Sequence, residues 1–182
     1  MYTLNNYHHN IEPSELIIDL LEQLLASGFA EDTTLKLINS VLLTSNEWQE
    51  PATLDMALID RYSGICQFLK MGAACTYVKR GNWVECIKST SLPIGVLENI
   101  DMETITKKLY DGDFVIMISD GIVEALNCQD KEECMGRIIM EIDSLNPREM
   151  ALEILNKSLE MTDGIPKDDM TVICTGIWDR LE

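Results

Sequence analysis

The sequence lacks the features of a membrane-spanning or nucleic-acid-binding protein. None of its apolar runs approaches the roughly 18 residues that are needed to cross a bilayer. Only 14 of its 182 residues are Lys or Arg, against 31 Asp or Glu, so it has no basic cluster for nucleic-acid phosphates. The net charge of -17 suits solubility, bound divalent cations or a basic partner. We therefore expect a soluble, cytoplasmic segment with no membrane contact and no nucleic-acid partner.

The chain also lacks any C-x-x-C spacing among its cysteines, which is the usual pattern of zinc ribbons and redox motifs. Most of the cysteines lie in apolar or helical patterns. We therefore interpret them as reduced core thiols in a reducing compartment, rather than as disulfides or zinc ligands. The six are Cys66, Cys75, Cys86, Cys128, Cys134 and Cys174.

The apolar fraction of 46% is sufficient for one domain with a sizeable core. Residues 1–12 are polar and predict a tail, so the domain is expected over residues 13–182. Apolar residues at helical spacing predict a helix pair over 14–43, in which Gly28 ends the first helix and Asp32 caps the second.

The apolar pattern changes at Thr53 to short segments that are separated by turn residues. These predict a meander of antiparallel strands, including a hairpin with its tip at 79–83 and a strand at 105–109. The run Phe114 to Ile118 is apolar throughout, as in a strand buried on both faces. Three helices, with Asn146 capping the last, and a final strand are then predicted at 121–127, 131–143, 147–161 and 171–177.

Two carboxylates lie next to the most apolar strands. Asp120 follows the run 114–118, and Asp168 precedes the final strand. If these two strands are antiparallel neighbours, the end of one lies beside the start of the other, so both carboxylates converge at one edge of the sheet. A parallel arrangement would separate them by the length of a strand.

Clustered carboxylates suit hard cations, because Mg²⁺ and Mn²⁺ prefer oxygen ligands. Two such ions can activate a water molecule and stabilise a transferred phosphoryl group. Asp-Gly and Asp-Asp pairs are equally typical of ordinary turns, and we interpret Asp111-Gly112 and Asp163-Gly164 in that way. Spacing alone leaves both interpretations open.

Four segments, in their order and spacing, resemble the SpoIIE-like group of type 2C, metal-dependent protein serine/threonine phosphatases. The resemblance covers roughly residues 13–178 and implies an α/β (α+β) fold, an α-β-β-α sandwich of antiparallel sheets flanked by helices. The segments are Thr53-Leu54-Asp55, Ser91-Leu92-Pro93-Ile94-Gly95, Met117-Ile118-Ser119-Asp120-Gly121-Ile122-Val123-Glu124 and Asp168-Asp169-Met170-Thr171-Val172.

The resemblance also implies a function and a set of site residues. Asp120 and Asp168 match the family's metal-ligating aspartates, and Gly121, Asp169 and Thr171 would support them. A complete site holds two Mn²⁺ or Mg²⁺ ions, whose activated water hydrolyses phosphoserine or phosphothreonine. The implied substrate is a phosphorylated regulatory protein of the anti-anti-sigma-factor type.

The family's first metal motif, Asp-Gly-x-Gly, would stand upstream of Pro13, where this sequence has neither Asp nor Gly. We therefore expect an N-terminally truncated fold, either a fragment of a longer enzyme with a membrane anchor upstream or a degenerate copy. Such a chain would have little or no phosphatase activity, because only part of the metal site is present. Open sheet edges would favour a homodimer or strand exchange.

Three hypotheses from different classes follow from the sequence. The chain is part of a phosphatase catalytic domain, a catalytically inactive protein-interaction module, or a plain structural fragment. The helix pair at 14–43 bears on the second hypothesis, because equivalent helices in the SpoIIE-like group lie next to the metal site.

Overall fold

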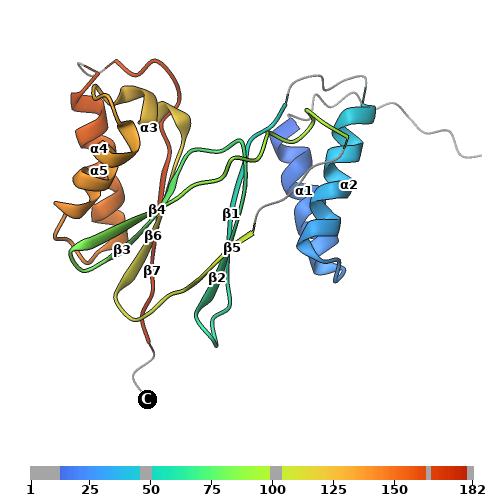
Figure 1. Ribbon diagram of the computed structural model, residues 1–182, viewed down its shortest axis with the longest axis horizontal. Helices are drawn as coiled ribbons and strands as arrows, with labels where there is room; N and C mark the ends of the chain where they lie inside the picture. The colour runs from blue at the N-terminus through green and yellow to red at the C-terminus, as the bar shows by residue number, and fades with distance from the viewer. Residues whose placement is uncertain (1–12, 46–50, 99–103, 163–164, 180–182) are drawn as a thin grey trace, which may run out of the picture. The chain divides into compact units, whose positions relative to one another are not determined.

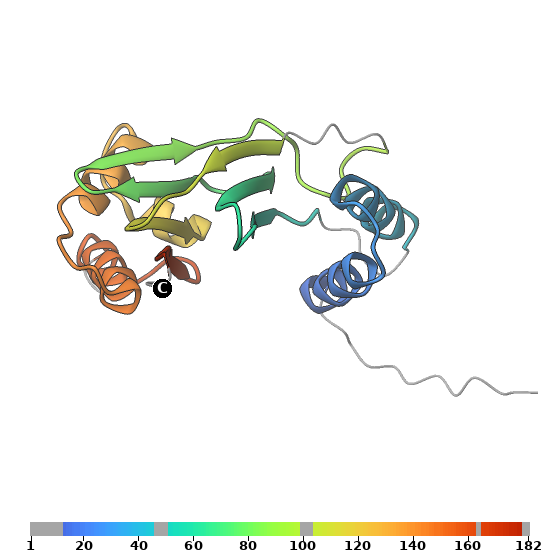
Figure 2. The same cartoon turned by 90° about the horizontal axis from the view of Figure 1, so that it is seen from below.

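The computed structural model describes residues 13–45, 51–98, 104–162 and 165–179 (Figures 1 and 2). The chain divides into two compact units. The first consists of Met1–Ala52 and Leu92–Asp101, and the second of Thr53–Ser91 and Met102–Glu182. The predicted tail at 1–12 and the predicted turn at Asp163-Gly164 lie outside the described residues.

The first unit contains the predicted helix pair, as α1 (Pro13–Ala26) and α2 (Glu31–Thr44). Their apolar stripes are buried at Ile17 and Leu21 in α1 and at Leu35, Ile38 and Leu42 in α2. This part of the secondary-structure prediction is confirmed.

The capping of α2 differs from the prediction. Ala30 occupies the N-cap position, and Asp32 lies one residue inside the first turn. The Asp32 carboxylate instead accepts a hydrogen bond from the Lys36 ammonium one turn later, with Nζ and Oδ2 2.8 Å apart. The prediction that Asp32 caps the helix was therefore wrong, although a carboxylate in the first turn still favours the helix dipole.

A buried asparagine attaches the segment 92–98 to α2. The Asn39 side chain donates to the carbonyl of Leu97 at 2.9 Å and accepts from the backbone N–H of Gly95 at 2.8 Å. Gly95 has a φ of 88°, in the left-handed region that favours glycine. The conformation of this loop therefore depends on one side chain of α2.

The second unit contains two antiparallel sheets. The three-stranded sheet has the order β1-β2-β5, and the four-stranded sheet has the order β4-β3-β6-β7. The strands are β1 (Leu54–Ile59), β2 (Ile65–Met71), β3 (Thr76–Arg80), β4 (Trp83–Ile87), β5 (Thr104–Lys108), β6 (Asp113–Ile118) and β7 (Val172–Gly176).

The predicted hairpin is confirmed as β3 and β4, with Arg80 opposite Trp83 and a positive φ at Gly81. The predicted continuous meander is wrong, because the strands divide between two sheets. Strand β2 pairs with β1 and β5, whereas β3 pairs with β4 and β6. The chain changes sheet between β2 and β3, between β4 and β5 and between β5 and β6. Strand periodicity carries no signal for such crossings.

Three helices cover the face of the four-stranded sheet that is turned away from the three-stranded sheet (Figure 1). Asn146 caps the last of them as predicted, because its side chain accepts from the N–H groups of Arg148 and Glu149. The helices are α3 (Asp120–Ala125), α4 (Lys131–Met140) and α5 (Pro147–Glu160).

Strand β6 has a core on each of its faces. Phe114, Ile116 and Ile118 pack with the helices, whereas Val115 packs with the residues of β2 that lie between the two sheets, including Phe68. This explains why its sequence is apolar at consecutive positions instead of alternating. The predicted α/β (α+β) class, with two antiparallel sheets and helices, is confirmed.

A lysine from β3 satisfies the carbonyls at the end of α4. The Lys79 ammonium donates to the carbonyl oxygens of Ile139 and Met140 at 2.9 and 3.1 Å. Burial lowers the pKa of Lys79, and the charge of Asp143 opposes that shift. The helix ends at Met140 rather than at the predicted residue 143, and a cation at this end also suits the helix dipole.

A buried polar triad joins the two sheets. The ammonium of Lys70 in β2 lies 2.6 Å from the Oδ2 atom of Asp55, which is directly opposite in β1. Both groups bond to the hydroxyl of Thr76 in β3, which accepts from Lys70 at 2.8 Å and donates to Asp55 at 2.6 Å. Lys70 is fully buried, so its charge depends on these two partners.

We predict that Lys70→Met destabilises the chain by about 3–5 kcal/mol, because it leaves the Asp55 carboxylate mostly buried without its cation. The double variant Asp55→Leu/Lys70→Met should recover part of this loss, since it removes both charges. Urea unfolding followed by circular dichroism measures both free energies. Lys108→Met, at an exposed position of β5, is the matched control and should be near neutral.

Candidate functional site

The strands that carry the two predicted metal ligands are neighbours. Strand β6 pairs with β7 in antiparallel register, with Ile118 opposite Val172. Asp120 is the first residue of α3, two residues beyond β6, and Asp168 lies four residues before β7. The predicted antiparallel pairing is confirmed, and it brings both exposed aspartates to the same edge of the four-stranded sheet.

Ser119 links the segments that carry the two aspartates. Its N–H donates to the carbonyl of Thr171 at 3.0 Å, and its hydroxyl accepts from the Thr171 N–H at 2.9 Å. The same hydroxyl donates to the carbonyl of Asp169 at 3.1 Å. Sequence patterns gave no signal for this role, because Ser119 bonds to residues about 50 positions away along the chain and its side chain does not cap α3.

Gly121 allows the two segments to approach each other closely. A Cβ atom at this position would lie 2.3 Å from the carbonyl oxygen of Asp169 and 3.2 Å from that of Asp168. Any other residue would push α3 away from the 168–169 backbone. Glycine at this position is therefore required by packing, whereas Gly112 in the other described Asp-Gly pair serves a turn with a positive φ.

The remaining predicted site residues lie in the same segment. One carboxylate oxygen of Asp168 accepts the N–H of Asp169 at 2.8 Å, which orients the Asp168 side chain. Asp169 itself is exposed, and its carbonyl accepts from Ser119. Thr171 forms backbone hydrogen bonds to Ser119 and leads into β7.

The donors at this edge fit a hard cation. They are carboxylate oxygens on two segments that Ser119 links, with neither His nor Cys in residues 119–121 and 168–171. Among the described residues, no group of three His, Cys, Asp or Glu ligand atoms that all lie within 4.8 Å of one another includes Asp120 or Asp168. Metal binding at this edge stays a prediction, with two candidate ligands from the described chain.

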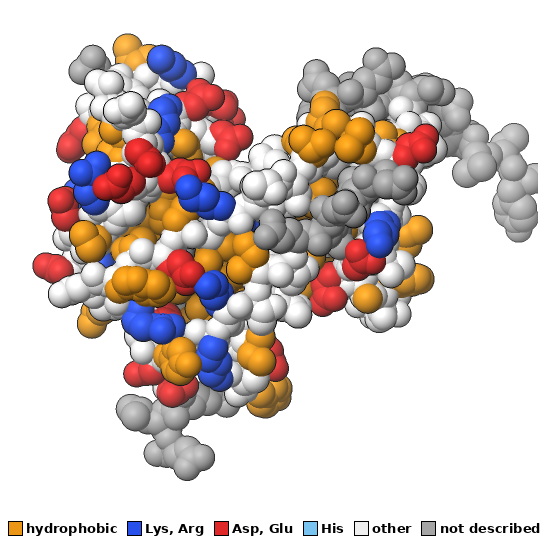
Figure 3. Space-filling view, viewed as in Figure 1, with side chains coloured by type: hydrophobic (Ala, Val, Ile, Leu, Met, Phe, Trp, Pro, Cys, Tyr) orange, Lys and Arg blue, Asp and Glu red, His pale blue; other side chains and the backbone are white. Residues whose placement is uncertain are grey.

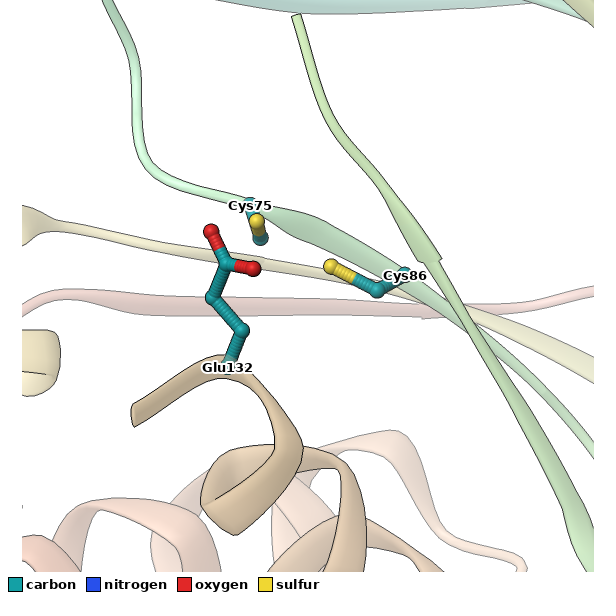
Figure 4. Close-up of side chains that lie close together, drawn as sticks. All are labelled: Cys75, Cys86 and Glu132. Carbon is teal, nitrogen blue, oxygen red and sulfur yellow. The ribbon is translucent and has the colours of Figure 1, made fainter. Parts of the chain in front are cut away.

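A different cluster meets that distance limit. The sulfur atoms of Cys75 and Cys86 and a carboxylate oxygen of Glu132 all lie within 4.8 Å of one another (Figure 4). Cys86 is opposite Tyr77 in the β3–β4 hairpin, which makes it the diagonal neighbour of Cys75. Glu132 comes from the first turn of α4.

All six cysteines are free thiols, as predicted. Cys66 and Cys75 are buried in the core, and the other four are partly exposed and pack against it. Burial raises the pKa of Cys66 to about 12. The hydrogen bond from Cys75, together with the nearby charge of Lys88, lowers the pKa of Cys86 to about 7. Sequence spacing gave no signal, because residues 75 and 86 meet only through the register of the hairpin.

A pocket of about 430 Å³ opens beside this cluster, between the β3–β4 hairpin and α4. Its walls include Cys86, Lys88, Glu132 and Arg137, and neither Asp120 nor Asp168. Over the face of the second unit in Figure 3, acidic and basic side chains are interspersed with apolar ones. The described chain thus has a pocket that is separate from the edge where the aspartates converge.

Comparison with known proteins gives one consistent family. A family model described as Stage II sporulation protein E (SpoIIE) matches residues 13–177. The Stage II sporulation protein E of Bacillus subtilis is 33% identical over 174 residues, which are 95% of this chain and 21% of that protein. The chain therefore spans about a fifth of the length of this curated relative.

Solved structures agree with this match. The PP2C phosphatase domain of B. subtilis SpoIIE, solved with a fragment of its regulatory domain, is 34% identical and has a TM-score of 0.82 over 91% of this chain and 49% of that one. The Mn-presoaked phosphatase domain of the same protein is 28% identical, with a TM-score of 0.70 over 99% and 79%.

No helix in the described part of the chain is both long and apolar enough to span a membrane.

We predict that Gly121→Ala destabilises the chain by about 1–3 kcal/mol, because the new methyl group meets the Asp169 carbonyl. The shift should also displace the 168–169 segment, which is visible in the amide NMR signals of Asp168 and Asp169. Gly136→Ala in α4 is the control, since no atom lies within 4 Å of its added Cβ. That substitution should be neutral or stabilising by up to about 1 kcal/mol. Equal effects of the two substitutions on stability would contradict the packing role of Gly121.

Proposed function

The chain belongs to the SpoIIE family of PP2C-type phosphatase domains, and from this we propose that it is part of a metal-dependent protein phosphatase acting on phosphoserine or phosphothreonine. The observation that carries the proposal is the convergence of Asp120 and Asp168 at the β6–β7 edge. Family membership supports this activity, and the edge supplies two residues that can perform part of it.

Asp120 and Asp168 would ligate Mn²⁺ or Mg²⁺ in the proposed site, two ions in a complete one. Bound ions of this kind supply an activated water and neutralise charge on a phosphoryl group in transfer. Gly121 and Ser119 hold the two ligand segments together, and Asp169 and Thr171 support the Asp168 side through their backbone groups. The manganese soak of the related B. subtilis domain supports the choice of ion.

The proposed substrate is a phosphorylated regulatory protein of the anti-anti-sigma-factor type. Its support is the resemblance of the four sequence segments to SpoIIE-like phosphatases and the 33% identity to the B. subtilis protein. No described side chain is assigned to substrate recognition.

The 182-residue chain by itself should hydrolyse a phosphoprotein substrate only slowly. Two carboxylates neutralise and position two dications poorly, and among the described residues no group of three ligand atoms that all lie within 4.8 Å of one another includes Asp120 or Asp168. The same observation favours a second candidate function, a protein-interaction module without catalysis.

We predict that the chain binds Mn²⁺ weakly and that Asp120→Asn or Asp168→Asn weakens this binding by about tenfold or more, because each removes a charged ligand. Titration of Mn²⁺ followed by electron paramagnetic resonance of the free ion measures the affinity. Asp111→Asn, which alters the other described Asp-Gly pair, is the matched control and should bind like the unaltered chain.

Phosphate release from a phosphoserine protein in Mn²⁺ separates the two candidate functions. A slow, Mn²⁺-dependent release that Asp120→Asn abolishes is expected for the phosphatase. A fast release would contradict the proposed weak turnover while supporting the phosphatase. If the chain neither binds Mn²⁺ nor releases phosphate but still binds a protein partner, the interaction module is the function that the results support.

We also infer that the chain associates through its sheet edges, as a homodimer or by strand exchange. Strands β1 and β5 border one sheet and β4 and β7 the other, and outer strands offer unpaired backbone groups. Light scattering should give twice the chain mass of 20.6 kDa at high concentration. A monomeric mass at every concentration would contradict this inference.

A further inference from the structure

The sulfur cluster beside the pocket draws its three ligand atoms from three elements. Cys75 immediately precedes β3, Cys86 lies in β4, and Glu132 lies in the first turn of α4. Figure 4 shows the three side chains directed toward one another. Their ligand atoms all lie within 4.8 Å of one another.

The surrounding structure holds these three residues in place. The β3–β4 ladder fixes the diagonal relation of Cys75 and Cys86. The hydroxyl of Tyr77, which is opposite Cys86, donates to the backbone carbonyl of Glu132 at 3.2 Å and so ties α4 to the hairpin. Cys75 and Tyr77 belong to the core that lies between the sheet and the helices.

The spacing matches the coordination sphere of a small tetrahedral ion. Zinc lies about 2.3 Å from sulfur and about 2.0–2.2 Å from a carboxylate oxygen, which sets its ligand atoms roughly 3.5–3.8 Å apart. The upper limit of 4.8 Å on the distances between the three ligand atoms exceeds that separation by about 1 Å.

We propose that Cys75, Cys86 and Glu132 form a zinc-binding site that is separate from the phosphatase edge. The protein supplies three ligands, of which Cys86 and Glu132 also line the pocket between the hairpin and α4. Sulfur ligands select zinc over Mg²⁺ and Mn²⁺, which prefer oxygen. The bound ion would cross-link β3, β4 and α4.

The charges around the cluster suit such an ion. Two thiolates and one carboxylate carry three negative charges, which exceed the two positive charges of zinc by one. The Lys88 ammonium forms an ion pair with Glu132 and balances the remaining charge.

The proposed site shares no residue with the proposed phosphatase site. Asp120 and Asp168 lie at the β6–β7 edge, and neither lines the pocket. The zinc site therefore does not depend on the proposed catalytic function. Zn²⁺ prefers the thiolates of this site, whereas Mn²⁺ and Mg²⁺ prefer the carboxylates of the other, so the two sites can be tested separately.

Titration of the full, reduced chain with Co²⁺ tests the proposal, because cobalt bound to thiolate gives a charge-transfer absorption in the near ultraviolet. We expect this absorption to saturate at one Co²⁺ per chain and to disappear when Zn²⁺ is added. Cys75→Ser and Cys86→Ser should abolish it. Glu132→Gln should weaken Zn²⁺ binding by about tenfold or more, measured by competition with a chromophoric chelator.

Two control variants test the assignment. Cys174→Ser changes a partly exposed thiol of β7, and Cys128→Ser changes a partly exposed thiol between α3 and α4, both outside the cluster. Both should bind Co²⁺ and Zn²⁺ like the unaltered chain. The side chain of Glu132 is 39% exposed, so Glu132→Gln should fold even if a cysteine variant does not, and circular dichroism verifies this.

The proposal fails if the unaltered chain shows no thiolate–cobalt absorption, or if Glu132→Gln binds Zn²⁺ like the unaltered chain. Absorption that persists in a folded Cys86→Ser variant would also overturn it, since another pair of thiols would then hold the ion. If the chain takes up no Zn²⁺ and loses two free thiols in peroxide, and Cys86→Ser prevents that loss, Cys75 and Cys86 would be a redox pair instead.

Discussion

The pairing of β6 with β3 on one side and β7 on the other is the constraint on which the second unit depends. Because β6 is buried on both faces, it holds the helices against one side of its sheet and the three-stranded sheet against the other. The same two strand pairings position the residues of both proposed sites. Pairing with β7 brings Asp168 beside the turn that carries Asp120, and pairing with β3 fixes the strand that Cys75 precedes.

Features that depend on local sequence could be predicted, and features that depend on distant partners could not. The apolar run at 114–118 predicted a doubly buried strand, and antiparallel pairing then brought Asp120 and Asp168 to one edge. The end of α4 at Met140 depends on Lys79, which is remote in sequence. The meeting of Cys75 with Cys86 depends likewise on hairpin register and on the docking of a helix.

The second unit contains buried cations although the chain has a net charge of -17. Lys70 is balanced by a carboxylate and a hydroxyl, whereas Lys79 is held by two helix carbonyls. Asp113 is the reverse case, a buried carboxylate paired with Arg80, whose guanidinium also lies 4.5 Å from the ring centre of Tyr110. Each pair joins separate strands or a strand and a helix, so separating these elements would leave a buried charge without its partner.

The attachment of Lys79 to the last turn of α4 has a dynamic consequence. A helix end whose carbonyls bond only to water frays independently. The end of α4 can open only if its carbonyls release the ammonium of Lys79, a residue of the central strand β3. The C-terminal turn of α4 and strand β3 should therefore open as one cooperative unit. Slow exchange of backbone amides with solvent would then extend from the sheet into the helix.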